Sequence, residues 1–433
     1  MVDGFRLSIF IQYLITTVII GSIGTLLLKK QTHRLFLIIF TGGYWIYSGI
    51  GAAHKDVSGY YYLYYSIELL ITTLFFVFFI FSLNTFCLRL SRKINIIWEK
   101  ESKKQSNIFI IIYLLILFIP LIYPTNKLIR FFSPPSPNLT AVFAGSINGS
   151  NFTLVGKILQ YAQLLLTPFF YLYLAKYTKK YRNVVFLQLL VLYLQYIKGG
   201  YIGRGTILMA FFILFIAYWE MNPKKRRKLF IIGIIFSIGL LFFFYYYMIA
   251  RNGTTIQKAT LLKAFTSIID IELAFPKDVG IKIIESNNRA NIFQYIKWIV
   301  TLPIPKIFIG SISGARINYE ISEYILGLSR DSKGWYVVLP GFLGESIYIY
   351  GKLFFWIHGI FVAFLLALSV KIVERNRVFR FLKLYLVFLF GYNLNRAGIS
   401  AILPDLVNGC MFLFLYLFLV NYNYKKYIKY FVS

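Results

Sequence analysis

Cysteine, histidine and acidic residues are scarce in this chain of 433 residues. It contains 2 Cys and 3 His, and only 16 Asp and Glu together. Cys87 and Cys410 both stand at or within apolar stretches, so neither a disulfide framework nor a cysteine-based metal site is indicated. No internal repeat is evident either, which disfavours a transporter built from inverted halves.

Basic residues outnumber acidic ones, with 46 Lys and Arg and a formal net charge of +30. The basic residues stand in short clusters between apolar stretches, where the positive-inside rule for membrane proteins explains them. The excess of positive charge therefore indicates membrane lipid, and no nucleic acid, as a partner.

Hydrophobic residues make up 58% of the chain and charged residues 14%. Apolar stretches of about 20 residues recur throughout, and each can cross a hydrocarbon core of roughly 30 Å. The first, Phe5 to Leu28, is too long for a signal-peptide core and lacks a small-residue cleavage site, so we expect a retained anchor. The sequence predicts an all-α polytopic membrane protein of about eleven transmembrane helices, at residues 5–28, 33–53, 60–86, 108–123, 154–175, 183–198, 203–219, 229–250, 340–370, 378–398 and 404–421.

Basic clusters occupy every second gap between these helices: Lys29/Lys30/Arg34, Arg89–Lys104, Lys176–Arg182, Lys224–Lys228, Lys371–Arg380 and Lys425–Lys429. This alternation predicts a multi-pass protein with its N-terminus outside and its C-terminus in the cytoplasm. It divides the chain into a membrane bundle of about eight helices (1–250), one large external (periplasmic) loop (251–339) and a second bundle of about three helices (340–433).

The large external loop carries its own helical patterns. Apolar residues recur at helical spacing over Thr255–Ile269 and Ala290–Thr301, and Pro276 is suited to be the first residue of a further short helix. We expect these short helices to lie on the membrane surface. The stretch LPIPKIF then predicts an extended turn that holds Lys306, because each proline restricts the residue before it.

Four ionisable residues from separate parts of the chain fall near the outer ends of predicted membrane helices: Arg204, Glu345, Arg396 and Asp405. Such groups in membrane helices usually face a cavity or a partner. Arg204 and Arg396 are flanked by glycines, and a guanidinium group can hold a diphosphate through paired hydrogen bonds. The alternative is that both side chains extend to lipid headgroups.

Glu345 is the candidate general base. It lies about one and a half turns after Pro340, where partial desolvation would raise its pKa toward the value that proton removal from a sugar hydroxyl requires. The alternative is a structural ion pair. His358 stands thirteen residues later, which on a continuous helix is about 20 Å deeper and on a different face, so we expect a core histidine there.

The external loop adds further cations that could hold phosphate or an extended glycan. They are Arg251, Arg289, Lys306 and Arg316, with Arg330 and Lys333 beside them. Solvated surface positions are the alternative for each of them.

With these residues in view, the chain resembles the O-antigen polymerase (Wzy-type) family of oligosaccharide repeat unit polymerases. The likeness rests on the many-helix layout with a large late loop and on loose motifs. These are IKGGYIGRGT around Arg204, LPIPKIF in the loop, LPGFLGESIYIYG around Glu345 and NRAGIS around Arg396.

The resemblance implies a metal-independent glycosyltransferase of the bacterial cytoplasmic (inner) membrane that needs no cofactor. It would join polyprenyl-diphosphate-linked oligosaccharides into a surface polysaccharide such as the O-antigen of lipopolysaccharide, with a chain-length regulator protein as a further partner to consider. Arg204 and Arg396 would bind diphosphate, Glu345 would activate the acceptor hydroxyl, and Lys306 and Arg316 would position phosphate or sugar.

Three alternatives remain open at this point. An O-antigen ligase shares the layout but transfers to a lipid A core. A lipid-linked oligosaccharide flippase is a transporter, for which evenly short loops and a charged central cavity are more typical. A scaffold membrane protein would have no use for glycine-flanked arginines.

Overall fold

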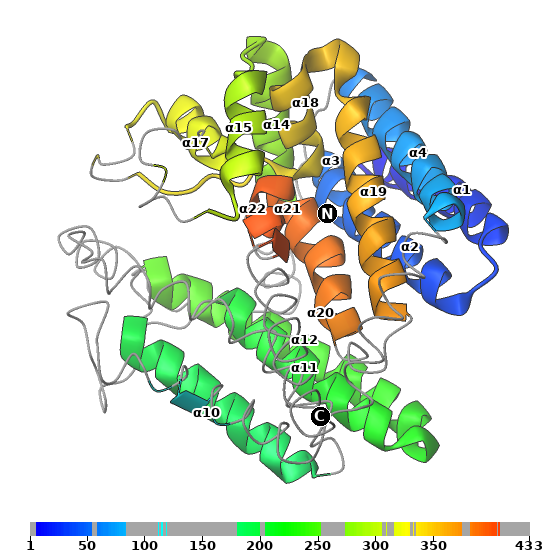
Figure 1. The fold of residues 1–433 in the computed structure, drawn as a ribbon, viewed down its shortest axis with the longest axis vertical. Coiled ribbons are helices and arrows are strands. Elements are labelled where there is room, and N and C mark those ends of the chain that lie inside the picture. The colour runs from blue at the N-terminus through cyan, green and yellow to red at the C-terminus, as the bar shows by residue number, and fades with distance from the viewer. Residues whose placement is uncertain are drawn as a thin grey trace, which may run out of the picture. The chain divides into compact units, whose positions relative to one another are not determined.

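The computed structural model describes residues 6–53, 59–83, 180–199, 204–252, 273–304, 316–329, 335–374 and 382–404, and a few single residues besides. Every regular element in these ranges is a helix (Figure 1). The chain forms two compact units, one of Met1–Glu99 with Ile269–Ser433 and the other of Lys100–Ile268. The helical fold class is thus confirmed, whereas the division at residues 250 and 339, which follows membrane topology, stays a prediction.

Three helical segments are long and apolar enough to cross a membrane. They are Leu7–Leu27, Gln31–Ala53 and Tyr60–Ser82, and they coincide with the first three predicted spans. The first is α1 (Leu7–Leu27), the second joins α2 (Gln31–Tyr44), the π-helical η1 (Trp45–Ile50) and α3 (Gly51–Ala53), and the third lies in α4 (Gly59–Ser82). These segments support a membrane protein. The total of about eleven spans and the external position of the loop remain predictions.

Close contacts of small and aromatic residues hold α1, α2 and α4 together. Thr17 Oγ1 of α1 lies 2.5 Å from the Tyr65 hydroxyl of α4, and the rings of Tyr13 and Tyr65 are 4.7 Å apart. Gly24 faces Thr73 and Leu37, and a Cβ at position 24 would collide with both. Small residues allow helix backbones to approach closely, as is common between membrane helices.

The predicted span 340–370 is two helices in the structure, α18 (Gly341–Phe354) and α19 (Trp356–Glu374). The helical backbone is broken at Gly351, whose φ of 76° lies in the region that glycine tolerates best. The Arg289 guanidinium group occupies the space that a side chain at position 351 would need. The expected single helix is therefore corrected to a bent pair.

Helix α19 lies beside α4 (Figure 1). The ring pairs Tyr64–Phe355 and Phe79–Phe364 join the two helices with centroids 5.1 and 5.5 Å apart. Between these pairs, a Cβ at Gly359 would lie 2.6 Å from Thr72 Oγ1, so only glycine allows this approach.

Three helices come from the predicted external loop: α14 (Ala274–Ser286), α15 (Ile292–Thr301) and α17 (Ile317–Leu326). The helix expected over 290–301 is confirmed as α15, and Asn291 caps it by accepting hydrogen bonds from two backbone N–H groups. Pro276 lies in the first turn of α14 rather than at its first residue. The helix expected over 255–269 lies outside the described residues.

Helix α14 packs tightly on α18, because Gly280 and Gly344 face each other. A Cβ at Gly344 would lie 3.1 Å from the Gly280 Cα atom. On α15, Phe293, Ile296 and Val300 form an exposed apolar stripe, which supports the expected position at the membrane surface.

Residues 382–404 form a short, broken helical rod. It consists of α20 (Leu382–Phe388), the π-helical η6 (Leu389–Asn393), α21 (Leu394–Ala397) and α22 (Ile399–Pro404). Its contact with α2 is close, because a Cβ at Gly43 would collide with the Gly391 carbonyl oxygen. The Asn395 amide group donates to the carbonyl oxygens of Phe40, Phe390 and Gly391 at 3.0–3.3 Å, which joins the rod to α2.

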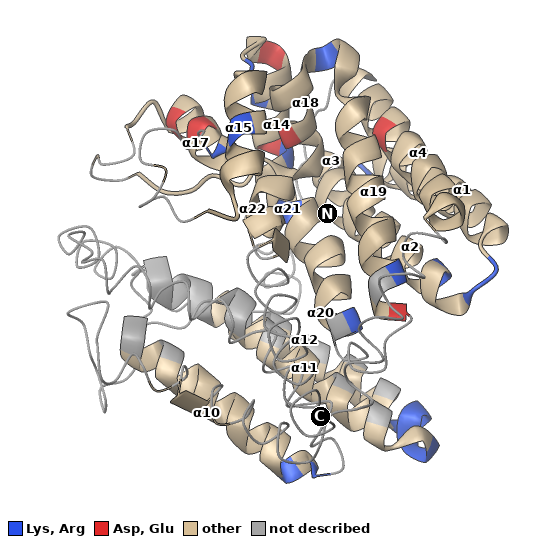
Figure 2. Ribbon diagram, in the orientation of Figure 1, with Lys and Arg blue, Asp and Glu red and all other residues tan. Residues whose placement is uncertain are grey.

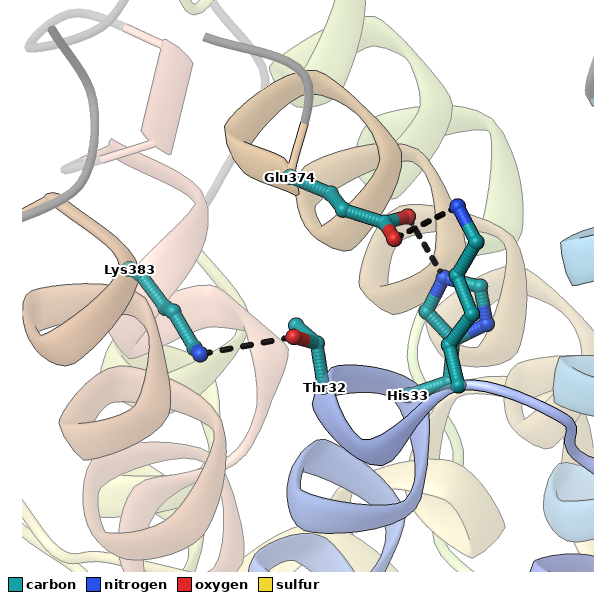
Figure 3. Close-up of polar contacts among 5 residues, drawn as sticks. Thr32, His33, Glu374 and Lys383 are labelled. Carbon is teal, nitrogen blue, oxygen red and sulfur yellow. Dashed lines mark hydrogen bonds and ion pairs between the residues drawn. The ribbon is translucent and has the colours of Figure 1, made fainter. Parts of the chain in front are cut away.

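An ion cluster joins the beginning of α2 to the end of α19 (Figure 3). The Glu374 carboxylate lies 2.7 Å from His33 Nε2 and 2.7 Å from Lys30 Nζ. Lys383 adds a contact of 3.5 Å to the Thr32 hydroxyl. Figure 2 shows most of the helical ribbon free of charged residues, with charges mainly near helix ends.

The unit Lys100–Ile268 contains α10 (Tyr181–Gly199), α11 (Arg204–Met221), the 3-10 helix η2 (Pro223–Lys225) and α12 (Arg226–Asn252). Phe211 packs on Phe236, and Gly233 faces Phe215, so α11 and α12 are antiparallel. The Tyr181 hydroxyl donates to the Leu214 carbonyl oxygen, which joins α10 to α11. These helices cover the residues of three predicted spans, and that they cross a membrane stays a prediction.

Candidate functional site

Glu345 lies in the second turn of α18 and is completely buried, with an exposed fraction of 0%. Its carboxylate reaches the start of α22, where Oε1 accepts the Ser400 N–H at 3.0 Å and Oε2 accepts the Ile399 N–H. Both donors lie at the start of a helix, where backbone N–H groups have no partner within the helix. Glu345 therefore anchors the turn between α21 and α22.

Gly398 makes this turn possible. Its φ of 81° lies in the region that favours glycine, and a Cβ at this position would overlap the Glu345 carboxylate. Gly398, two residues after Arg396, therefore has a structural role: it allows a carboxylate from another helix to reach the backbone N–H groups of the turn.

His358 lies beside Glu345, and the expected separation of about 20 Å is wrong. The His358 Nε2 atom is 3.5 Å from Glu345 Oε2, and both side chains are completely buried. The sequence estimate assumed one continuous helix. The break at Gly351 and the turn at Phe355 instead fold α19 back along α18, so that residues thirteen apart meet.

Arg316 reaches the same turn from the residue before α17. It donates from Nη2 to the Ser400 carbonyl oxygen at 3.2 Å and from Nη1 to the Tyr319 hydroxyl at 3.3 Å. Its guanidinium carbon lies 5.1 Å from the centre of the Tyr319 ring, a cation–π distance. Ser400 therefore contacts Glu345 through its N–H group and Arg316 through its carbonyl group.

Arg396 lies on α21, directly before this turn, and is half-buried. Its guanidinium carbon is 5.8 Å from the centre of the Tyr392 ring. We define the cluster of Glu345, Arg316, Arg396, Gly398 and Ser400 as the turn site. Glu345 and Arg316, which the sequence selected from separate regions, both contact Ser400 there, and Arg396 precedes the turn by two residues on the chain.

The other predicted site residues lie elsewhere. Arg289 is exposed, follows α14 and covers the break at Gly351. Arg204 begins α11 and Arg251 is near the end of α12, both in the unit Lys100–Ile268. The antiparallel pairing places them at the same end of this hairpin, about 12 Å apart along its axis. Lys306 and Asp405 lie outside the described residues.

Sequence reasoning missed several buried polar groups near Glu345. Glu68 of α4 is completely buried and receives a hydrogen bond from the Tyr44 hydroxyl, with 3.4 Å between the two oxygens. Tyr295 of α15 is also buried, and burial together with the charge of Glu345 raises the pKa of its hydroxyl well above its usual value. A glutamate in the middle of the apolar stretch 60–86 was the available signal.

No group of three or more His, Cys, Asp and Glu suited to a metal ion occurs in the described part of the chain. A separate cavity of about 440 Å³ lies between α14 and α17. Its lining is mainly apolar and includes Lys277, Asp278 and Lys282, but no residue of the turn site.

Comparisons with protein-family models, with curated proteins and with solved structures each find no match for this chain. The chemistry of the turn site and the apolar helices around it therefore carry the functional proposal.

Proposed function

We propose that this protein is a polymerase of the bacterial cytoplasmic membrane that joins polyprenyl-diphosphate-linked oligosaccharides on the external face of the bilayer. One observation supports the proposal most: Glu345 and Arg316 both contact Ser400 at one turn of a mainly apolar helical unit, and Arg396 stands two residues before the glycine of that turn. Cations fixed in a site that excludes most water stabilise the charge that develops on a departing diphosphate.

In this proposal Arg396 binds the diphosphate of the donor, and Arg316 holds the turn and contributes positive charge beside it. Because the donor is already activated by its diphosphate, neither a metal ion nor a nucleotide sugar takes part. Arg204, Arg251, Arg289 and Lys306 stay predicted substrate-binding residues, and the Arg289 side chain is exposed.

Glu345 has two possible roles, and they differ in what the carboxylate does. As a general base, it would take the proton of the acceptor hydroxyl. As a positioning residue, it would hold the turn that carries Arg396. Complete burial and the two N–H donors support positioning, since both carboxylate oxygens are occupied by backbone donors.

The experiment uses the purified protein in liposomes with a polyprenyl-diphosphate-linked repeat unit and separates the products on a gel. We expect a ladder without added metal. Arg396→Ala should abolish it, whereas Lys225→Ala, at the exposed connection between α11 and α12, should leave it intact. Transfer only to a lipid A core would identify a ligase, and lipid movement without transfer would identify a flippase.

Glu345→Gln separates the two roles of the carboxylate. If Glu345 positions the turn, activity falls by a similar factor at every pH and thermal stability falls with it. If Glu345 is the base, the rise of the rate with pH that reports its ionisation disappears while thermal stability stays close to wild type.

A further inference from the structure

Helix α19 is about as long as a membrane is thick. Its 19 residues, Trp356–Glu374, give a length of about 28 Å, close to the roughly 30 Å of a hydrocarbon core. The ion cluster around Glu374 marks one end of this helix. At the other end, Phe355 packs on Tyr64 near the beginning of α4, with ring centroids 5.1 Å apart. The junction between α18 and α19 therefore lies level with the end of a membrane-suited helix.

The helices of the predicted external loop begin at the same end of the bundle. The Arg6 N–H group, directly before α1, donates to the carbonyl oxygen of Ala53, the last residue of α3. Beside it, a Cβ at Gly51 would collide with the carbonyl oxygen of Leu273, which directly precedes α14. Helices α1 and α4 are parallel, as their contacts show. The start of α14 therefore marks the level at which the apolar spans begin or end.

Helix α15 follows α14 and lies against the last part of α18 (Figure 1). The Ala290 N–H group, just before α15, donates to the Tyr348 carbonyl oxygen at 2.8 Å. The neighbouring Arg289 guanidinium group packs on Gly351. With 10 residues, α15 is about 15 Å long and too short to cross a bilayer.

Large apolar side chains are exposed on either side of this contact. We define them as the interfacial surface: Phe293, Ile296 and Val300 of α15 with Leu353 and Phe354 at the α18–α19 junction. Phe293 is 78% and Leu353 is 75% exposed, so these side chains gain most from an apolar environment. Leu7 and Tyr60, at the beginnings of α1 and α4, are exposed as well, which continues the apolar surface along the spans.

Lysine and tryptophan side chains stand beside these apolar residues. Lys297 of α15 and Lys352 of α18 are half-buried. Trp356, at the junction, donates from its indole N–H to the Leu353 carbonyl oxygen at 2.9 Å. Lysine can bury its apolar stem and hold its ammonium group among lipid phosphates, and tryptophan is enriched at membrane surfaces. The chemistry of this region therefore fits a phospholipid leaflet, with acyl chains below and phosphate groups above.

We propose that the interfacial surface lies in the bilayer leaflet at this end of the spans, with α15 parallel to the membrane plane. Its apolar side chains contact acyl chains, and Lys297 and Lys352 contact lipid phosphate groups. Because α15 and the residue before it are joined to α18 at Tyr348 and Gly351, lipid contact also holds the bend between α18 and α19. Such lipid binding is independent of the reaction that the protein performs.

Spin labels on introduced cysteines test this in liposomes, because oxygen concentrates among acyl chains whereas a charged nickel complex stays in water. At Phe293→Cys and Leu353→Cys we expect more frequent collisions with oxygen than with the nickel complex. Glu285→Cys, at an exposed glutamate of α14, is the control and should show the reverse order. The labelled wild type gives the signal of Cys87 and Cys410, which is subtracted.

Two results would overturn the proposal. Collisions mainly with the nickel complex at both apolar positions would place the surface in water. Labels that reach neither reagent would show that protein, such as a second copy of this chain, covers it. None of the substituted side chains is buried, so the variants should fold as the wild type does.

A series of labels along α15 tests its orientation. For a helix parallel to the membrane plane, oxygen collisions rise and fall with the helical period, with maxima at Phe293→Cys, Ile296→Cys and Val300→Cys and a minimum at Gln294→Cys. A steady change from one end of α15 to the other would contradict the proposed orientation.

Discussion

Two glutamate–histidine pairs join helices in the unit Met1–Glu99 with Ile269–Ser433, and they are built differently. Glu345 and His358 are completely buried, and backbone N–H groups supply the other contacts of the carboxylate. Glu374 and His33 lie where α2 begins and α19 ends, and Lys30, with 57% of its side chain exposed, completes that cluster.

The difference shows how the environment changes the contribution of one residue pair. At the helix ends, Lys30 is exposed and water can replace it, so its contact contributes little, whereas His33 and Glu374 are only 4% and 14% exposed and their contact is less screened. Around Glu345 no solvent is available, and the loss of one partner leaves a buried charge or donor without compensation. We therefore expect substitutions in the buried pair to have the larger effects.

The largest effect is expected for Gly398→Ala. The new Cβ would overlap the Glu345 carboxylate and require a backbone conformation that alanine avoids. Together these effects should cost at least about 3 kcal/mol of stability and remove activity. Gly42→Ala is the matched control, since nothing lies within 4 Å of its Cβ position. Thermal unfolding in detergent compares the two, and equal Tm values would contradict the described turn.

Glu345→Gln should cost roughly 3 kcal/mol, because an amide NH₂ group would face one of the two buried backbone donors and leave it unpaired. Glu374→Gln, at the other pair, should cost about 2 kcal/mol, because exposed Lys30 can be solvated again although buried His33 loses its carboxylate partner. Chemical denaturation of both variants measures the contrast. A larger loss in Glu374→Gln would reverse our comparison.

Arg316→Lys keeps the positive charge but removes the paired hydrogen bonds. A lysine ammonium group cannot contact both the Ser400 carbonyl oxygen and the Tyr319 hydroxyl in the geometry of a guanidinium group. We expect a loss of about 1 kcal/mol in stability and a weaker product ladder. Wild-type values in both measurements would show that charge alone is required.

The smallest effect is a dependence of stability on acidic pH at the helix-end cluster. Burial raises the pKa of Glu374, but the hydrogen bonds and charges of His33 and Lys30 outweigh it and lower this pKa from 4.5 to about 2. A lowered folded-state pKa stabilises the fold above about pH 4.5, and this contribution is lost as the pH falls toward 2. Glu374→Gln should show a shallower loss than the wild type over this range, as thermal unfolding at several pH values would detect.

Much of the helical layout could be predicted from apolar length and basic clusters. The first three predicted spans and the helix over 290–301 appear where the sequence placed them. The bend at Gly351 could not be predicted, because a glycine within an apolar stretch is compatible with a straight helix as well as a broken one. In the structure the break coincides with the close packing of Arg289 against this glycine.

The sequence could predict which residue types belong to the candidate site, but not which of these residues contact one another. Ionisable residues near the ends of apolar stretches identified Glu345 and Arg396, since such groups are unfavourable in lipid without a partner, and Arg316 was one of several candidate cations in the loop. Their partners lie far away in the sequence, as Ser400 does from Arg316. The same holds for His33 and Glu374 in the helix-end cluster. The fold also brought in Glu68 and His358, which no spacing rule connects.

The sequence by itself therefore determined a helical, membrane-suited chain, because long apolar stretches can satisfy their backbone in lipid only as helices or closed barrels. The tertiary structure alone decided which charged groups meet. A bend of one residue at Gly351 brings His358 back to Glu345, and the turn at Gly398 exposes two N–H groups to the same carboxylate. Burial then makes these few contacts matter more than any charge at the helix ends.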